Sequence, residues 1–239
     1  MSDFDLQDKT VFITGATRGI GAAIANEFLS LGARVIGTGT QRDPGTNLHK
    51  YYQADFSAIE NINACADFVR DSEPDILINN AGINKNLPFV EIDPELFQRI
   101  QQVNVFAPFR LCQAAIPSMS RKGWGRIVNL SSIWGKIGKS HRASYSTSKF
   151  ALDGLTLSLA AEHAEDGILA NCIAPGFTDT ELTRTMLGDE GIRKIISTVP
   201  IGRMATVEEI ARFTVWLASK KNTYITGQNI AIDGGFSRV

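Results

Sequence analysis

The stretch "TVFITGATRGIGAAIANEF", residues 10–28, joins a short apolar run to a helical pattern through a turn that contains Gly15, Gly19 and Gly21. Glycine lets the backbone turn sharply and approach a ligand closely, and the helix N-terminus that follows offers free N–H groups to a phosphate. Tight strand–helix turns also use glycine without any ligand. The position after the first strand nevertheless favours dinucleotide binding, although the spacing G-x-x-x-G-x-G differs from the commoner G-x-G-x-x-G.

The rest of the chain repeats this strand–helix alternation. Short apolar runs predict strands at 10–14, 34–38, 51–56, 75–79, 125–131, 169–174 and 228–233. Helical patterns include 21–32, 94–120, 144–165 and 206–219, the last with Thr206 and Glu209 at capping-box spacing. Such alternation predicts an α/β fold with a doubly wound parallel sheet of about seven strands and helices on both faces. We expect a single domain over residues 1–239.

Composition excludes several classes of function. The 239 residues are 44% hydrophobic and 21% charged, with a formal net charge of -1, so nothing indicates general binding to nucleic acid or membrane. No apolar run reaches the length of a membrane span, and the polar N-terminus is unlike a signal peptide. Cys65, Cys112 and Cys172 are scattered, which is typical of reduced thiols in a cytoplasmic protein. No metal-ligand spacing is present, so no metal site is expected.

The end of the second predicted strand bears on which dinucleotide binds. An enzyme that selects NAD usually has Asp or Glu there, bound to the ribose 2′-hydroxyl. Gly39 occupies this position and Thr40 follows it, and no carboxylate appears before Asp43. Arg18 and Arg42 could bind a 2′-phosphate, because guanidinium groups suit phosphate. The sequence therefore favours NADP(H), with NAD(H) still possible.

The segment "YSTSK", residues 145–149, places Tyr145 and Lys149 four positions apart, on one face of a helix. Taken alone, such a pair is typical of a solvated surface. The alternative is a proton donor, because a nearby ammonium favours the phenolate and lowers a tyrosine pKa from its usual value of roughly 10. Only the rest of the chain can decide between the two.

These motifs together resemble the short-chain dehydrogenase/reductase family, whose fold is Rossmann-type. The matching segments are "TGATRGIG" (14–21), Asp55, "NNAG" (79–82), Asn104, Ser132, "YSTSK" (145–149), "APGFTDT" (174–180) and "ITGQNIAIDGG" (225–235). They occur in the family's order and cover nearly the whole chain. The overall pattern is similar to the 3-oxoacyl-[acyl-carrier-protein] reductase branch.

The resemblance implies a role for each matching residue. The implied catalytic residues are Asn104, Ser132, Tyr145 and Lys149. The implied cofactor-binding residues are Gly15, Thr17, Arg18, Gly19, Ile20, Gly21, Thr40, Asp55, Asn80, Ala81, Gly82, Tyr145, Lys149, Pro175, Gly176 and Thr178. Reduction of a ketone leaves negative charge on oxygen, so a donor must supply a proton. Tyr145 would supply it, Lys149 would lower its pKa, and Ser132 would hold the carbonyl oxygen.

Two departures from the family pattern concern the cofactor and the partner. Residues 42–50 are short and turn-rich where the family usually has a helix, which is unusual between parallel strands. Glu165 and Asp166 stand where carrier-protein reductases usually have a basic residue, and would repel an acidic carrier. A basic docking patch on another loop could be formed by Arg121, Lys122 and Arg126. The alternative, which we favour, is that these three residues belong to an ordinary solvated loop.

The segments around the expected substrate do not identify it. The loop 134–142 carries Lys136, Lys139, His141 and Arg142, which are either surface charge or an attraction for an anionic substrate. We expect residues 177–200 to form a lid over the substrate. The resemblance favours reduction of a carrier-bound acyl ketone, with conversion of a sugar, polyol or other small alcohol as the alternative. The intact Asn104, Ser132, Tyr145 and Lys149 count against a third function, non-enzymatic dinucleotide sensing. Family resemblance also predicts a homotetramer.

Overall fold

One parallel sheet organises the molecule. The computed structural model describes residues 6–45 and 47–239, and within them seven strands form a sheet of order β3-β2-β1-β4-β5-β6-β7. The strands are β1 (Thr10–Ile13), β2 (Arg34–Gly39), β3 (Lys50–Gln53), β4 (Ile76–Asn79), β5 (Gly125–Leu130), β6 (Ile168–Pro175) and β7 (Asn229–Ile232). Each strand pairs in parallel with its neighbours. The predicted doubly wound parallel sheet is confirmed.

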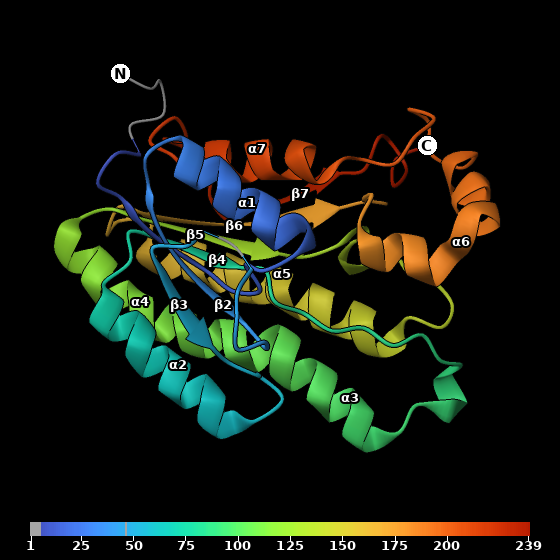
Figure 1. Cartoon of the computed structure of the whole chain (residues 1–239), viewed down its shortest axis with the longest axis horizontal. Coiled ribbons are helices and arrows are strands. Elements are labelled where there is room, and N and C mark those ends of the chain that lie inside the picture. The colour runs from blue at the N-terminus through green and yellow to red at the C-terminus, as the bar shows by residue number, and fades with distance from the viewer. Residues whose placement is uncertain (1–5, 46) are drawn as a thin grey trace.

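Helices cover both faces of this sheet (Figure 1). The longer helices are α1 (Gly19–Ser30), α2 (Ile59–Ser72), α3 (Pro94–Gln101), α4 (Ala107–Lys122), α5 (Ala143–His163), α6 (Glu181–Ile196) and α7 (Val207–Leu217). Helices α1 and α7 lie on one face, and α2, α4 and α5 lie on the other. The predicted capping box begins α7, where Thr206 and Glu209 bond reciprocally.

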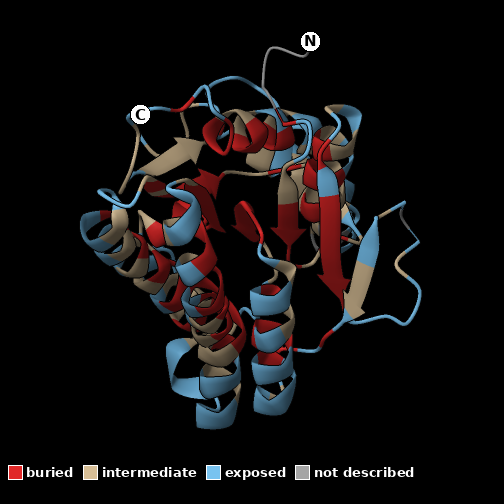
Figure 2. Cartoon of the chain, turned by 90° about the vertical axis from the view of Figure 1, so that its left-hand side faces the viewer, coloured by how far each residue is buried: buried red, intermediate tan, exposed pale blue. Residues whose placement is uncertain are grey.

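Strand residues alternate between two apolar cores. Val11 and Ile13 of β1 point into the core beneath α1 and α7, whereas Phe12 points into the core beneath α2 and α4. Strand β4 repeats this with Ile76 and Leu77, because successive strand side chains face opposite sides of a sheet. The central strands β1, β4, β5 and β6 are therefore largely buried between the helical layers, whereas the edge strands β3 and β7 are half-buried or exposed (Figure 2).

The crossover from β2 to β3 contains no helix in the part that the structure describes, as its sequence predicts. Leu48 of this crossover packs against the apolar core instead. A Cβ on Gly37 of β2 would lie only 2.6 Å from a methyl carbon of Leu48. The missing side chain at Gly37 therefore makes room for Leu48, which covers the sheet where a crossover helix would otherwise pack.

Two predicted segments differ in detail from the structure. The single helix expected over 94–120 is divided into α3 and α4 by a π-helical turn, η2 (Gln102–Phe106). The segment expected as a lid, 177–200, contains α6, which is interrupted at Gly188 by a left-handed residue with φ 61°. A π-turn inside a helix often marks a functional position, and Asn104 lies in this one.

The strand order places a ligand site before any side chain is considered. The chain winds outward in both directions from the neighbours β1 and β4, so the crossovers leave a crevice at their carboxyl ends. Of the helices within residues 6–45 and 47–239, none has both the length and the apolar character needed to span a membrane.

Candidate active site

Every predicted site residue lies at the carboxyl edge of the sheet or in the helical turns beside it. The loops after β1 to β6 contain Gly15, Thr17, Arg18, Thr40, Asp55, Asn80, Ala81, Gly82, Ser132, Gly176 and Thr178. Pro175 ends β6, and Gly19, Ile20 and Gly21 form the first turn of α1. Asn104 lies in η2, and Tyr145 and Lys149 in the first two turns of α5. The fold thus gathers residues that are far apart in the sequence.

Sterics account for the glycines of the first loop. Gly15 has φ 65° and Gly19 has φ 54°, a region that favours glycine. A Cβ on Gly21 would lie 2.1 Å from the Gly15 oxygen and 2.4 Å from Asn80 Nδ2. Asn80 Nδ2 donates to the backbone oxygens of Thr14 and Gly15, both at 3.0 Å. The loop after β4 therefore clamps the loop after β1 in one shape.

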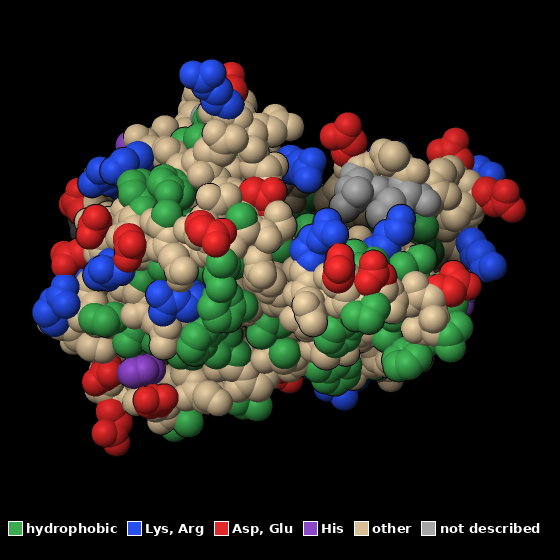
Figure 3. Space-filling view, turned by 90° about the horizontal axis from the view of Figure 1, so that it is seen from below, with side chains coloured by type: hydrophobic (Ala, Val, Ile, Leu, Met, Phe, Trp, Pro, Cys, Tyr) green, Lys and Arg blue, Asp and Glu red, His purple; other side chains and the backbone are tan. Residues whose placement is uncertain are grey.

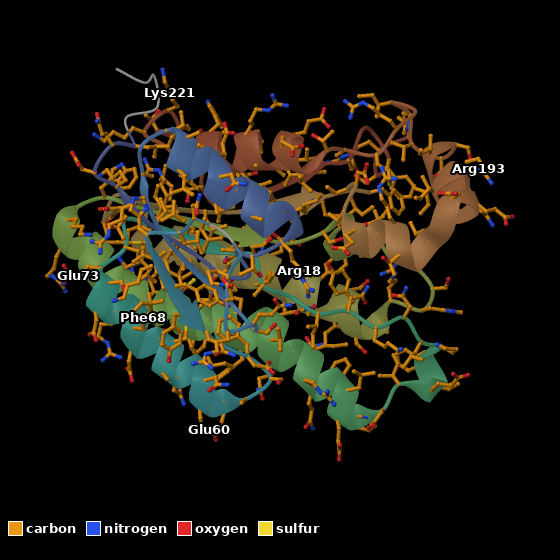
Figure 4. All side chains as sticks on the ribbon, viewed as in Figure 1. Arg18, Glu60, Phe68, Glu73, Arg193 and Lys221 are labelled. Atoms are coloured by element: carbon orange, nitrogen blue, oxygen red, sulfur yellow. The ribbon has the colours of Figure 1, made fainter. Side chains whose placement is uncertain are left out.

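The N-terminus of α1 fits a dinucleotide pyrophosphate. Arg18 is the N-cap in an extended conformation, and its side chain makes no capping hydrogen bond. The N–H groups of the first turn therefore lack a side-chain acceptor, and the helix dipole adds partial positive charge there. Arg18 is exposed beside this turn (Figure 4). Free donors, a dipole and a cation together match a phosphate group.

Gly39, the last residue of β2, has little room for the carboxylate side chain that is usual in an NAD site. A Cβ on Gly39 would lie 2.8 Å from Thr17 Cγ2 and 2.9 Å from the Tyr51 hydroxyl oxygen. Tyr51 is held there because its hydroxyl donates to the Gln41 oxygen at 2.5 Å. Sequence reasoning missed Tyr51, since only the register that pairs Gly37 with Tyr51 brings its ring to this strand end.

Asp55 and Gly82 lie at the two ends of the expected cofactor path. Asp55 is exposed and accepts hydrogen bonds from the Ser57 N–H at 2.9 Å and the Ser57 hydroxyl at 2.7 Å. These bonds lower the pKa of the Asp55 carboxyl. A Cβ on Gly82 would lie 3.3 Å from Asn104 Oδ1 and 3.6 Å from Lys149 Nζ. Gly82 therefore joins the loop after β4 to the catalytic candidates.

Asn104 connects three segments from the core. It is fully buried, its Oδ1 accepts from the Ile83 N–H at 2.8 Å, and its Nδ2 donates to the Ile83 oxygen at 2.9 Å. The same Nδ2 donates to the Ser148 hydroxyl at 2.9 Å. Ile83 and Ser148 were not among the predicted residues. The amide thus holds the loop after β4 against α5, one residue before Lys149.

Lys149 is a buried ammonium group. Its Nζ donates to the Leu130 oxygen at 2.6 Å and lies 5.5 Å from the centroid of the Tyr145 ring. Burial lowers the pKa of Lys149 to about 8, because a charged amine loses solvation inside the protein. Lys149 therefore changes charge within the range of ordinary pH assays.

Tyr145 differs from the expectation in one respect. Burial raises the pKa of its phenol, and this outweighs the side-chain hydrogen bond with Ser132 and the positive charge of Arg142, which both lower it. The expectation that Lys149 lowers the pKa of Tyr145 is therefore wrong for this structure. The reason is that the phenol loses part of its solvation, although Tyr145 as a whole is only half-buried, and the cation that lowers its pKa is Arg142.

Ser132 and the segment after β6 complete the site. The Ser132 hydroxyl accepts from the Trp134 N–H at 3.3 Å and caps the short helix η3 (Ile133–Gly135). Thr178 is buried, and its hydroxyl donates to the Gly176 oxygen at 3.3 Å. Thr180 then caps α6, and a Cβ on Gly19 would lie 3.7 Å from its methyl carbon. Helix α6 thus begins against the glycine loop.

Of the three residues of the possible basic docking patch, Arg121 and Lys122 are ion-paired at the surface and Arg126 is buried. Arg121 pairs with Glu73 at 2.6 Å, and Lys122 pairs with Asp75 at 3.2 Å. Arg126 is 5% exposed, with its guanidinium 4.5 Å from the Trp124 ring centroid. All three precede or begin β5, at the amino edge of the sheet. Figure 4 shows Glu73 at the end of the molecule opposite Arg193 of α6.

Comparison with known proteins identifies the chain as an oxidoreductase that acts on CH–OH or carbonyl groups. It belongs to the short-chain dehydrogenase/reductase family, and the family model described as Enoyl-(Acyl carrier protein) reductase matches residues 15–237. The 3-oxoacyl-[acyl-carrier-protein] reductase of Salmonella typhimurium is 37% identical over 245 residues, covering 98% of this chain and 99% of the relative.

Two solved structures show the same fold. A proposed NAD(P)-dependent gluconate 5-dehydrogenase from Beutenbergia cavernae, with bound NADP at low occupancy, is 33% identical with a TM-score of 0.90, covering 97% of each chain. The ligand-free aldohexose dehydrogenase of Thermoplasma acidophilum is 32% identical with a TM-score of 0.91, covering 98% of this chain and 96% of that one. Proteins similar to this chain therefore differ in the substrates their names give.

Proposed function

We propose that this protein is an NADP(H)-dependent enzyme that interconverts a ketone and a secondary alcohol. The observation that carries the proposal is the convergence of Ser132, Tyr145 and Lys149 beside a glycine loop shaped for a pyrophosphate. The bound cofactor would supply or accept the hydride. The protein would supply position, charge and a proton.

Tyr145 acts as the proton donor in this proposal. Its raised pKa keeps the phenol protonated at neutral pH, which is the form that donates during ketone reduction. Ser132, whose hydroxyl acts on the phenol of Tyr145, holds the carbonyl oxygen where negative charge develops. The Lys149 ammonium stabilises that charge, and Asn104 fixes the loop that approaches both groups.

Two features of the second strand support a preference for NADP(H). Gly39 carries no acidic side chain to recognise a ribose 2′-hydroxyl, and Thr17 and Tyr51 occupy the space where one would lie. Arg18, at the N-terminus of α1, offers a guanidinium to a 2′-phosphate. The related structure with bound NADP gives the same indication.

The substrate proposal favours a small molecule over a carrier-bound acyl chain. Identity to the 3-oxoacyl reductases favours the carrier-bound substrate. We give more weight to the ion pairs of Arg121 and Lys122 with Glu73 and Asp75, because the paired acids reduce the net positive charge offered there to an acidic carrier protein. We propose a sugar-like or other small hydroxy compound, under a lid formed by α6.

A purified-enzyme screen of NADPH oxidation against sugar ketones, small keto acids, cyclic ketones and acyl thioesters tests this proposal. We expect turnover of at least one small-ketone class, with no gain when an acyl thioester is attached to carrier protein. Preference for the carrier-bound thioester over all small ketones would reverse the substrate choice. Absence of turnover with every class would contradict the proposed reaction.

Self-association into a homotetramer is also proposed. Helices α4 and α5 expose apolar side chains, among them Phe109 and Leu157, and hydrophobic side chains interrupt the polar surface seen from below (Figure 3). Exposed apolar area of this kind is typical of interfaces between copies. Light scattering should give the tetramer mass, and a monomer at micromolar concentration would contradict it.

A further inference from the structure

Two cations gather on one aromatic ring beside the candidate active site. Lys139 Nζ lies 4.8 Å from the centroid of the Trp134 ring, and the Arg142 guanidinium carbon lies 5.8 Å from the same centroid. Trp134 follows Ser132 by two residues, and Arg142 precedes Tyr145 by three. Both cations are therefore tied to the segments that carry the hydroxyl groups of Ser132 and Tyr145.

An apolar wall supports these cations. Trp134, Phe177 and Phe236 pack edge-to-face with centroids 5.1 to 6.1 Å apart, and Lys139 also lies 6.0 Å from the Phe177 ring. The three rings come from the loop after β5, the loop after β6 and the C-terminal segment. Arg142 is half-buried beside this wall and Lys139 is exposed at its rim, so the apolar surrounding strengthens the attraction for an anion chiefly at Arg142.

Within the described residues, neither Lys139 nor Arg142 forms an ion pair with a carboxylate. Burial lowers the pKa of Lys139, and the positive charges of Arg142 and Lys194 lower it further. Burial also lowers the pKa of Arg142. Like charges held together without a partner are unfavourable. By contrast, Arg184 near the start of α6 is fully paired with Asp179.

We propose that the substrate carries a carboxylate, and that Arg142 and Lys139 bind it while Ser132 and Tyr145 hold the reacting oxygen. This inference rests on the proposed small-molecule function. The Arg142 guanidinium suits a carboxylate, which it can bind through two parallel hydrogen bonds. We call the pair Lys139 and Arg142, with the Trp134 ring beneath them, the carboxylate subsite.

The geometry favours a short hydroxy acid or keto acid. Arg142 precedes Tyr145 by three residues, and its positive charge acts on the phenol, so an anion bound to Arg142 is close to the proton donor. The phosphate of a carrier-protein arm lies at the far end of a long linker from its thioester. That phosphate therefore does not reach Arg142 while the acyl ketone is at Tyr145.

Calorimetric titration with matched acids and amides tests the subsite. The probes are lactate, 3-hydroxybutyrate and gluconate, each paired with its neutral amide, titrated into the enzyme with and without NADPH. These alcohols cannot be reduced by NADPH, so only binding is measured. We expect at least one acid to bind about tenfold more tightly than its amide, the order expected for a charge-assisted hydrogen bond.

Substitutions identify the source of this preference. Lys139→Gln and Arg142→Gln should each reduce the ratio of acid affinity to amide affinity several-fold. Arg142→Lys should keep part of the preference for the acid. The matched control is Lys50→Gln, because Lys50 also lies over an aromatic ring, 4.4 Å from the Phe68 centroid, but at the amino edge of the sheet. Lys50→Gln should leave the ratio unchanged.

The inference is overturned if no acid binds, if acids and amides bind equally, or if the ratio survives both Lys139→Gln and Arg142→Gln. The proposed function is checked separately by NADPH oxidation with neutral ketones. Turnover of neutral ketones without any preference for acids contradicts the subsite alone. Selective binding of acids without turnover of any ketone contradicts the proposed function alone.

Discussion

Two pairs of basic residues at opposite edges of the sheet differ in their electrostatic surroundings. At the amino edge, Arg121 and Lys122 are paired with Glu73 and Asp75. At the carboxyl edge, Lys139 and Arg142 lie together on Trp134, with no ion pair to a carboxylate in the part of the chain that the structure describes. The ion pairs at the amino edge tie the end of α4 to the segment before β4 and so stabilise the fold. The two adjacent cations on Trp134 have no such role, and in the inference above they bind an anionic ligand.

The largest loss of activity is expected from a substitution at the carboxyl edge, at Tyr145. Tyr145→Phe removes the proton donor at the carboxyl edge, so kcat for ketone reduction should fall at least about a hundredfold. The ring stays in place, so circular dichroism and NADPH affinity should not change. A Tyr145→Phe enzyme that retains substantial turnover would remove the assigned role.

The pH dependence of the reaction should report Lys149. The ammonium form is the one that stabilises developing negative charge, and burial lowers the pKa of Lys149 to about 8. The value of kcat/KM for reduction should therefore fall above about pH 8, by about tenfold per pH unit. In Lys149→Arg this limb should disappear, because a guanidinium stays charged.

Unfolding caused by deprotonation of Lys149 would not explain the predicted fall in kcat/KM above about pH 8. The folded state lowers the pKa of Lys149, so the unfolded chain binds more protons between about pH 8 and the ordinary lysine value. Stability from this group therefore rises with pH across that window and is lost as pH falls through about 8. Denaturant titrations at pH 7.5 and 9.5 should therefore show that Lys149 does not decrease the free energy of unfolding at the higher pH.

Removing one arginine from each edge tests whether only the carboxyl edge contributes to cofactor binding. Arg18→Ala should weaken NADPH binding about tenfold and leave NADH binding nearly unchanged, because a phosphate–guanidinium contact is lost. Arg121→Ala, which removes the pair with Glu73, should change neither affinity. Equal losses for NADPH and NADH in Arg18→Ala would assign that residue to packing alone.

The smallest effect is expected at Asp166, also at the amino edge. Its carboxylate accepts from the Ser120 hydroxyl at 3.1 Å and pairs with His163 at 3.0 Å. Asp166→Arg should change KM less than twofold for free and for carrier-bound thioesters. A lower, salt-sensitive KM for the carrier-bound substrate alone would instead favour docking of an acidic carrier protein there.

Local pattern was enough to predict the sheet and the grouping of site residues. Apolar runs are short and clearly bounded in this chain, so all seven strands were predicted, and the carboxyl ends of parallel strands must share an edge. The turn-rich segment 42–50 likewise predicted a crossover without a helix. Family resemblance supplied the choice of Asn104 and Ser132, which no local pattern would have selected.

Contacts between distant segments could not be predicted. The pair of Arg121 with Glu73 joins residues 48 positions apart, and the position of Tyr51 against Gly39 depends on strand register. The direction of the Tyr145 pKa depends on burial, which the fold as a whole determines. The roles of the site residues, the lid, the tetramer and the cytoplasmic location remain predictions.

Hydrogen–deuterium exchange with and without NADPH tests most directly which edge of the sheet binds ligands. We expect NADPH to protect the amides of residues 14–21, 38–42, 80–83 and 176–180, which lie at the carboxyl edge, and to leave residues 73–75 and 120–126 unchanged. Protection confined to the amino edge, or the same small change at both edges, would contradict the account.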